Sequence, residues 1–143
     1  MGDKFKGFRA EIWSLFKDCP HIFLATQEND QPRIRPVTLV NFAQRFWILT
    51  GTRSAKVRQI RENPKIEFCL LFEEREHHGY IRAAGFAKII SDRETKVNVA
   101  KHCDFFSNHW ESPDDPNYTL LELKPNEIEY LRPKERVVRK FKL

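Results

Sequence analysis

Hydroxyl and basic side chains gather in one short stretch of the chain, Thr50 to Lys56, which reads Thr-Gly-Thr-Arg-Ser-Ala-Lys. In the residues that follow, Val57 and Ile60 lie three apart, as they would on one face of a helix. Ser54 is a favourable N-cap residue for that helix. A helix start presents free backbone N–H groups and a positive dipole end. Together with the cations Arg53 and Lys56, this arrangement favours an anion such as a phosphate.

The stretch does not match the familiar nucleotide-binding motifs. It lacks the paired glycines and the Lys-Ser/Thr ending of a P-loop, and it lacks the three spaced glycines of a dinucleotide-binding turn. Most serine-capped helices that follow a strand bind no ligand. The phosphate hypothesis therefore depends on the elements that surround the stretch.

Two strand-like runs lead to this stretch. Residues 33–40 are rich in β-branched side chains, and residues 46–50 are aromatic or branched. Residues 41–45 form a short connection between the two runs. The pattern therefore predicts a hairpin whose second strand ends at the polar stretch.

The rest of the chain predicts two more helices and several more strands. Apolar residues at helical spacing indicate an amphipathic helix within residues 1–18, and Ser91 with Glu94 has the capping-box spacing of a helix that runs to about residue 103. Gly85 interrupts the longest strand-like run, which indicates a bend, a bulge or the close approach of another group. The further strands are expected at residues 21–26, 66–72, 80–90, 118–123 and 127–131, with a Pro-Asn turn between the last two.

This order of elements predicts the fold class. About seven strands, most of them joined by short hairpins, and three helices indicate an antiparallel barrel with helices packed outside it, in the mainly β or α+β class. We expect residues 1–143 to form a single domain, in which residues 1–18 are the N-terminal helix and residues 132–143 are a basic C-terminal tail.

The net charge of +5 is concentrated at one end of the chain. Residues 132–143 contain six basic side chains and one acidic side chain, which account for the whole excess. Such a tail is more often a solvated terminus or a subunit contact than a nucleic-acid site, so nucleic-acid binding is not expected as the main function. No apolar run approaches the roughly 20 residues of a membrane span, and the N-terminus lacks the apolar centre of a signal peptide, so we expect a cytoplasmic protein.

No set of side chains for covalent, acid–base or metal chemistry is recognisable. The sequence shows no Ser/His/Asp arrangement and no paired carboxylates of that kind. Cys19, Cys69 and Cys103 include no close pair that would indicate a disulfide framework. His102, Cys103 and His109 lack a fourth ligand at a recognisable spacing, so no metal site is expected. Catalytic residues stay unassigned, and the chain suits a protein whose reactive atom belongs to a cofactor.

Several short motifs follow one another in a characteristic order between residues 21 and 131. They are Leu24-Ala25-Thr26, Gln31 to Val37, Trp47 to Thr50, Ser54-Ala55-Lys56, Asn63-Pro64, the strand around Gly85, and Asp114-Asp115-Pro116 leading to Leu120-Leu121. In this order they resemble the pyridoxamine 5′-phosphate oxidase-like family of flavin-binding split barrels, and most closely its short members, often called general stress proteins. The resemblance implies an antiparallel split β-barrel of six to seven strands, with Greek-key connections and about three peripheral helices.

The resemblance also implies FMN as the cofactor and a homodimer with two FMN sites at the subunit interface. By similarity, the flavin phosphate would meet Arg35 or Arg33, together with Ser54 and Lys56. This position agrees with the anion site that the residues themselves predict.

The remaining cofactor contacts also rest on the resemblance. The isoalloxazine ring would lie against the backbone of one strand and the side chains of the next, and Trp110 of the partner subunit would cover it. The residues concerned are Pro36, Val37 and Thr38 on the first strand, and Trp47, Leu49 and Thr50 on the second.

The implied function is that of an FMN-dependent oxidoreductase or flavin reductase acting on an unidentified small molecule, with NAD(P)H as a candidate electron donor. True pyridoxamine phosphate oxidases are longer and carry a C-terminal substrate-binding pattern that this sequence lacks, so vitamin B6 chemistry is not expected. Two alternatives stay open. One is a non-catalytic flavin-binding or flavin-sensing protein, and the other is a family member that uses a deazaflavin or haem.

Overall fold

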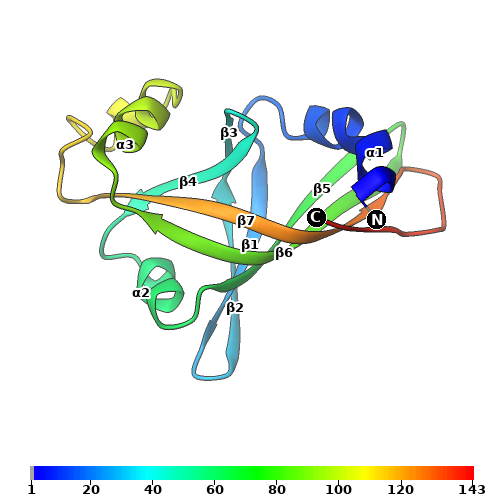
Figure 1. The fold of residues 1–143 in the computed structure, drawn as a ribbon, viewed down its shortest axis with the longest axis horizontal. Helices are drawn as coiled ribbons and strands as arrows, with labels where there is room; N and C mark the ends of the chain where they lie inside the picture. The colour runs from blue at the N-terminus through cyan, green and yellow to red at the C-terminus, as the bar shows by residue number, and fades with distance from the viewer. Residues whose placement is uncertain (1) are drawn as a thin grey trace.

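The computed structural model describes residues 2–143, with side chains from Phe5 onward, as a curled sheet with helices placed around it (Figure 1). The helices are α1 (Gly2–Leu15), α2 (Ala55–Glu62) and α3 (Arg93–Lys101), and a 3₁₀ turn, η1 (Phe106–Asn108), follows α3. The strands are β1 (His21–Glu28), β2 (Gln31–Thr38), β3 (Val40–Phe42), β4 (Arg45–Gly51), β5 (Lys65–Glu74), β6 (His77–Ile90), β7 (Tyr118–Leu131) and β8 (Arg139–Lys142).

Neighbouring strands are antiparallel and lie in the order β2-β1-β5-β6-β7-β4-β3, with β8 paired to β7 outside this path. Three of the hairpins turn on two residues that both have positive φ, namely Asn29-Asp30, Ala43-Gln44 and Arg75-Glu76. Such turns match the right-handed twist of paired strands. A curled antiparallel sheet with three helices confirms the predicted split-barrel class.

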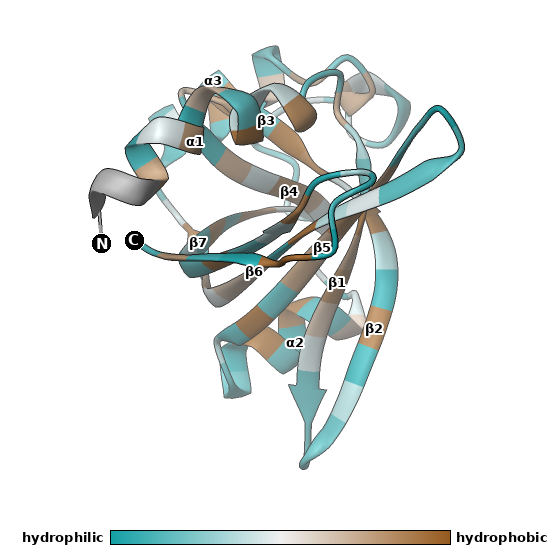
Figure 2. Ribbon diagram, turned by 90° about the vertical axis from the view of Figure 1, so that its right-hand side faces the viewer, coloured by the Kyte–Doolittle hydropathy of each residue, from teal (hydrophilic) through white to brown (hydrophobic). Residues whose placement is uncertain are grey.

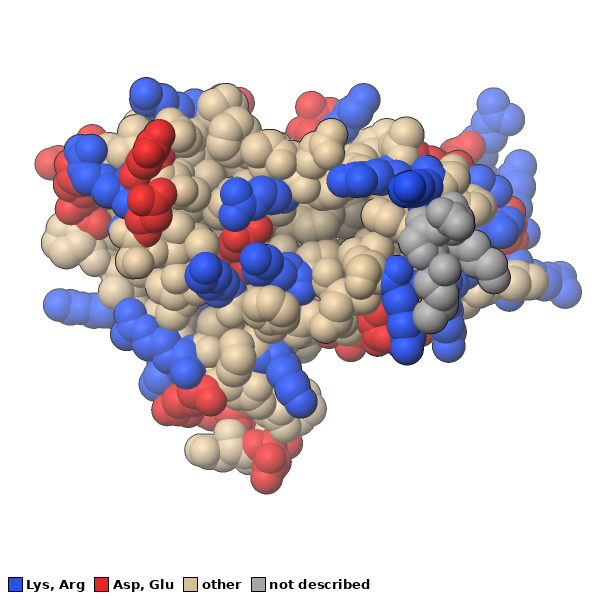
Figure 3. Space-filling view, in the orientation of Figure 1, with Lys and Arg blue, Asp and Glu red and all other residues tan. Residues whose placement is uncertain are grey.

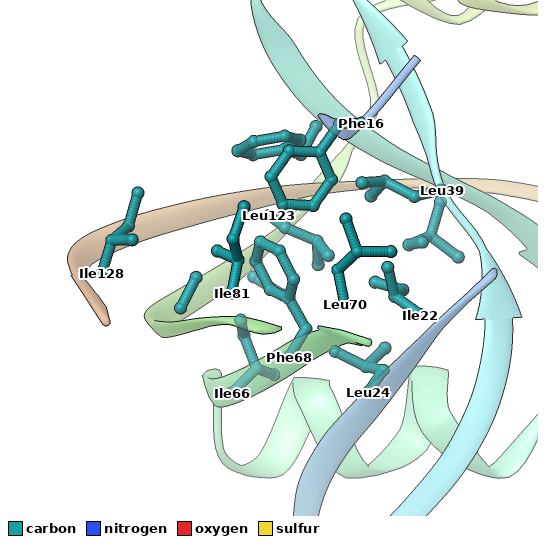
Figure 4. Packing of buried hydrophobic residues seen from close by; sticks show 14 of the residues in the cluster. Phe16, Ile22, Leu24, Leu39, Ile66, Phe68, Leu70, Ile81, Leu123 and Ile128 are labelled. Atoms are coloured by element: carbon teal, nitrogen blue, oxygen red, sulfur yellow. The ribbon is translucent and has the colours of Figure 1, made fainter. Parts of the chain in front are cut away.

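The larger hydrophobic cluster fills the inside of the curled sheet (Figure 4). In β1 the side chains of Ile22, Leu24 and Thr26 are buried while those between them are more exposed, as expected for a strand with one face inward. The predicted amphipathic helix is confirmed as α1, which packs Ile12 onto this core, and Phe16, just after the helix, joins it. Because α1 carries its apolar residues on one side, burying that side fixes the helix against one end of the barrel.

A second hydrophobic cluster lies where α3 and η1 cover the other part of the sheet. Trp47 and Leu49 on β4 and Tyr118 on β7 belong to it, together with Val99 of α3 and Phe106 of η1. Since Phe46 and Ile48 belong to the larger cluster, alternate residues of β4 bury opposite faces of that strand. The strand thus separates two packed layers, which holds its polar C-terminal end in one position.

The prediction of two strands separated by a Pro-Asn turn is wrong, because β7 is a single long strand from Tyr118 to Leu131. Pro125 lies opposite Gly85 on β6, where the register between the two strands shifts. A Cβ atom on Gly85 would lie 2.1 Å from the carbonyl oxygen of Lys124. Of the alternatives predicted at Gly85, the close approach of another group is therefore confirmed, and the register shift leaves Asn126 of β7 without a partner in the pairing. Because Gly85 has no side chain, it leaves room for Pro125 on the opposite strand. Proline usually avoids such a place inside a paired strand.

The run 33–40 also divides differently from the prediction. Residues up to Thr38 form β2, which pairs with β1, and only β3 pairs with β4 across the Ala43-Gln44 turn. Leu39, which separates the two strands, is fully buried, and its N–H donates to the carbonyl of Pro20. Burial of Leu39 fixes the point at which the chain leaves its pairing with β1 and begins its pairing with β4. A local strand pattern does not reveal this change of partner.

The third helix is capped by Asp92 rather than by the predicted Ser91. Its Oδ2 accepts a hydrogen bond of 3.0 Å from the N–H of Thr95, and the hydroxyl of Thr95 donates to the same oxygen. The capping signal was therefore shifted by one residue, with aspartate and threonine in place of serine and glutamate.

The basic tail contains β8, which the sequence did not predict. Arg139 to Lys142 pair with the end of β7, so this part of the tail belongs to the sheet. Three of its cations also form ion pairs: Arg132 with Glu11 and Glu135, Arg139 with Glu135, and Lys140 with Glu129. Part of the excess positive charge thus holds the tail and α1 against β7.

Apolar residues alternate along the strands rather than collecting in one helix (Figure 2). Within residues 2–143, no helix is long and apolar enough to cross a membrane.

Candidate functional site

A cavity of about 880 Å³ opens where the start of β1 and the ends of β2 and β4 meet α2 and the loop after α3. Its size lies within the range of small-molecule sites, roughly 300–1,000 Å³. The loop contributes residues from Asp104 to Trp110. Six residues predicted to bind the cofactor line this cavity: Val37, Thr38, Leu49, Thr50, Lys56 and Trp110.

The connection between β4 and α2 forms the polar end of the cavity. Lys56 Nζ donates a hydrogen bond of 2.7 Å to Thr50 Oγ1, and Ser54 Oγ lies 3.4 Å from the same atom. Ser54 occupies the predicted N-cap position of α2, yet its side chain makes no capping hydrogen bond. One ammonium and two hydroxyl groups are thus held together at the start of a helix.

Arg35 reaches this corner from β2 and is held there by neutral acceptors. Its guanidinium donates to the carbonyl of Leu24 (3.1 Å), to Thr26 Oγ1 (2.8 Å) and to Gln59 Oε1 (2.7 Å). Gln59 is buried on α2, so it ties the guanidinium to the helix that also carries Lys56. We call Arg35, Thr50, Ser54 and Lys56 the anion corner.

The anion corner has no negative charge of its own. Among the ion pairs of the described residues, none involves Arg35 or Lys56. Burial lowers the pKa of both side chains, and the charge of Arg35 lowers the pKa of Lys56 further. The nearby Glu28 is bound to Gln59 and Arg58, which lower its pKa to about 2. Both cations donate hydrogen bonds to neutral acceptors, but neither has a counter-charge. Two half-buried cations of this kind favour an anionic ligand.

The lining of the cavity also contains apolar side chains, next to polar ones such as Asp104 and Asn108. It includes Val37, Leu49 and Trp110, beside the backbone at the end of β4. The Trp110 indole donates to the carbonyl of Asn117 (3.0 Å) and packs against Phe106 and Tyr118, which leaves it only 6% exposed. Trp110 is therefore a cap on the core of its own chain that also faces the cavity.

Five of the predicted site residues do not line the cavity. Arg35 and Ser54 lie directly behind its polar end, within the anion corner. Arg33 is exposed and pairs with Glu28 at 3.5 Å. Pro36 pairs with Phe23 in the sheet, and Trp47 is buried in the second cluster with its indole donating to the carbonyl of Phe42.

Several residues of the cavity and of its support were not predicted from the sequence. Gln59 and Thr26 are buried polar side chains that position Arg35, and a hydrogen bond of 2.5 Å joins them. His21 and His109 line the cavity from two segments far apart in the sequence. The only sequence feature that pointed to burial of Gln59 was its place beside Val57 and Ile60 on a short helix. No sequence feature indicated that the two histidines line a common cavity. Within the part of the chain that is described, no three His, Cys, Asp or Glu side chains are arranged to hold a metal ion.

Comparison with protein families gives one match over most of the chain. A family described as pyridoxamine 5′-phosphate oxidase matches residues 8–132. Among curated proteins, general stress protein 26 of Bacillus subtilis is 26% identical over 114 residues, which cover 79% of this chain and 80% of that protein.

Solved structures share the fold over nearly the whole chain. A NimC/NimA family protein from Clostridium acetobutylicum has a TM-score of 0.77 and 25% identity, covering 97% of this chain and 94% of its own. A pyridoxamine 5′-phosphate oxidase-related, FMN-binding protein from Nostoc punctiforme has a TM-score of 0.72 and 20% identity, covering 95% and 96%. A heme-binding protein from Mycobacterium smegmatis has a TM-score of 0.72 and 15% identity, covering 87% and 53%.

Proposed function

The chain belongs to the pyridoxamine 5′-phosphate oxidase family, and on this basis we propose that it is an FMN-binding flavoprotein that acts as an oxidoreductase or flavin reductase on a small molecule. The family alone leaves the cofactor open, because the fold is shared by an FMN-binding protein and by a heme-binding protein. The choice of FMN therefore rests on the residues of this chain.

The observation that carries the proposal is the anion corner. Lys56 and Arg35 are partly desolvated, lie close enough for the charge of Arg35 to affect Lys56, and form no ion pair within the described chain. A phosphate ester would supply the missing negative charge and would accept hydrogen bonds from Lys56 and from the hydroxyl of Ser54. The residues present thus fit the phosphate of FMN.

The rest of the cavity suits a flat, partly apolar ring. Val37 and Leu49 offer apolar contact next to Thr38 and Thr50, whose hydroxyl and backbone groups can bond to ring oxygen and nitrogen atoms. When bound, FMN supplies hydride and electron transfer, and the protein binds, orients and shields it. The segments around His21 and His109 line the same cavity. They would determine whether a second small molecule can reach the flavin.

We also propose the homodimer that the family resemblance implies. The outer face of β2, β1 and β5 carries Ile34, Phe23 and Leu71, which are 70%, 45% and 56% exposed. The strand register places Phe23 next to Pro36 and Cys69 on this face, so the apolar side chains are neighbours in the sheet. An uncovered apolar sheet face of this kind is typical of a surface that a second subunit buries.

Haem is the second candidate, because His21, His109 and Cys19 line the same cavity. Imidazole and thiolate are the usual ligands of haem iron, and the propionates could meet the anion corner. Burial raises the pKa of the Cys19 thiol, which works against a thiolate ligand and leaves the histidines as the candidates.

One experiment separates these proposals. The purified protein is incubated with FMN or with haemin, desalted, and examined by absorption spectroscopy. A retained flavin spectrum with near-stoichiometric FMN supports the proposal, and a retained Soret band without FMN would replace it with haem. Bleaching of bound flavin by NAD(P)H under anaerobic conditions then distinguishes an enzyme from a protein that only binds or senses flavin. A deazaflavin would be recognised by its own spectrum after purification.

A further inference from the structure

A second cavity, of about 670 Å³, lies on another face of the barrel, between α1, the β3–β4 turn, the middle of β7 and the last two residues. It shares no lining residue with the proposed flavin cavity. The proposed function makes no use of it, so an inference about this second cavity stands or falls independently.

The floor of the second cavity is apolar. It is formed by residues of the core, among them Ile12, Phe46, Leu123 and Ile128, and by the Trp13 ring, which stacks on Phe46 with centroids 4.6 Å apart. These five side chains from α1, β4 and β7 bound the cavity with apolar atoms, and four of them are core residues with little exposed surface. A hydrocarbon group that enters this cavity is removed from contact with water where it touches the apolar floor. This burial of apolar surface favours binding.

The rim of the second cavity is basic. Its described cations are Lys6, Arg9, Arg45, Lys124 and Lys142. Figure 3 shows basic side chains around a recessed area near the middle of this face.

Little acidic charge balances this rim. Glu122 is the only acidic side chain among the described lining residues, and Arg45 binds both of its oxygens at 2.7 Å. The other four rim cations form no ion pair with the described residues. The rim therefore keeps a net positive charge next to hydrocarbon.

We propose that the second cavity binds an amphipathic anion, a molecule with an apolar body and a single carboxylate, of the size of a medium-chain fatty acid. The apolar floor takes the body, and the uncompensated cations at the rim take the carboxylate. Neither a purely polar anion nor a neutral hydrocarbon uses both parts of the cavity. The combination of the two therefore defines the class of ligand.

Decanoate is the probe, and its binding is measured by isothermal titration calorimetry on the purified protein, with and without added FMN. We expect saturable binding of one decanoate per chain. Binding should tighten roughly fourfold for each methylene added between hexanoate and decanoate, the factor for burying one such group. Acetate and 1-decanol are the controls, because each carries only one half of the proposed ligand. Both should bind at least tenfold more weakly than decanoate.

Two lysines of the rim provide the matching variants. Replacing both Lys124 and Lys142 by glutamate should weaken decanoate binding about tenfold through lost attraction and added repulsion. Lys101→Glu makes the same kind of change on α3, outside the cavity, and should leave the decanoate affinity within a factor of two. Unchanged FMN retention and unchanged thermal unfolding in each variant show that the fold is intact.

Three results would overturn the inference. The first is an absence of saturable decanoate binding to the folded protein, whether or not FMN is bound. The second is equal binding of 1-decanol, which would remove the role of the charged rim. The third is a loss of the dimer in the Lys124→Glu, Lys142→Glu variant, measured by light scattering, which would show that a second copy of the chain covers this face. If FMN fails to bind but decanoate binds as described, the proposed function fails while this inference holds.

Discussion

The anion corner makes a prediction about Lys56 that separates a ligand-binding role from a structural role. In Lys56→Met the side chain keeps its apolar stem and loses its charge and its hydrogen bond to Thr50. Since Lys56 has no acidic partner among the described residues, its ammonium is the group most available to a phosphate. We therefore expect the variant to fold and to bind FMN more weakly.

The magnitude follows from the loss of one charge-assisted hydrogen bond in a partly buried place. Such a bond contributes about 1–3 kcal/mol, so the dissociation constant of FMN should rise roughly 5- to 150-fold. Riboflavin lacks the phosphate, and its affinity should change by about twofold or less in the same variant. The preference of the wild-type protein for FMN over riboflavin should thus largely disappear.

The stability of the flavin-free protein provides a second readout. Burial and the charge of Arg35 lower the pKa of Lys56 in the folded state, so protonation of Lys56 disfavours folding at neutral pH. That penalty is fully present below the folded pKa and disappears as the pH rises toward the unfolded pKa. Lys56→Met removes the penalty, and we expect its free energy of unfolding without flavin at pH 7 to be equal to or higher than that of the wild type.

Titration of intrinsic fluorescence with FMN and with riboflavin, together with urea unfolding of the flavin-free proteins, tests both expectations. Arg58→Ala is the matched control, because Arg58 lies on the same helix but pairs with Glu28 outside the cavity. The reasoning is refuted if Lys56→Met binds FMN as tightly as the wild type. It is also refuted if FMN and riboflavin lose affinity equally, since the ammonium would then act on the fold rather than on the phosphate.

Three further predictions concern the subunit contact, the bulge and the tail. Ile34→Asp places a charge on the exposed apolar face and should convert the proposed dimer to a monomer in light scattering, whereas Val137→Asp, at a comparably exposed position, should not. Gly85→Ala forces a Cβ to within 2.1 Å of a backbone oxygen of β7 and should lower the free energy of unfolding by at least about 3 kcal/mol. In contrast, Gly7→Ala, in open space on α1, should raise it by roughly 0.5–1 kcal/mol. Hydrogen bonds from Arg132, at the start of the tail, and from Tyr130 lower the pKa of Glu11 from its ordinary 4.5. The stability that this carboxylate contributes is therefore present above pH 4.5 and is lost as the pH falls through the folded pKa. Glu11→Gln should therefore cost roughly 1 kcal/mol at pH 7 and progressively less in acid, as urea unfolding at several pH values would show.

Local patterns predicted those parts of the chain whose structure depends on near neighbours. The helix after Ser54 begins where the cap residue and the apolar spacing indicated. A bend, a bulge or a close approach was expected at Gly85, because a glycine inside a strand loses side-chain packing, and the structure shows the close approach. The three polar residues of the β4–α2 connection, Thr50, Ser54 and Lys56, lie together because at most six positions separate them in the sequence.

Long-range pairing decided what local patterns could not. The Pro-Asn pair that was expected to turn the chain lies in the continuous strand β7, because Gly85 on the neighbouring strand leaves room for it. The basic tail was expected to be solvated or a subunit contact, and part of it is the strand β8, since β7 offers a free edge there. Neither outcome can be read without knowing which strand lies opposite.

For the candidate site, the sequence by itself determined the residue types and the connection that holds Thr50, Ser54 and Lys56. Only the tertiary structure decided that Arg35 belongs to the same corner. The pairing of β2 with β1 and the hydrogen bond to the buried Gln59 bring the guanidinium of Arg35 there. The tertiary structure also decided that Trp47 lies outside the cavity, because it is fully buried in the second cluster, where its indole donates to the carbonyl of Phe42. The residue types thus determine which chemical groups are present. Contacts between segments far apart in the chain determine which of these groups are neighbours.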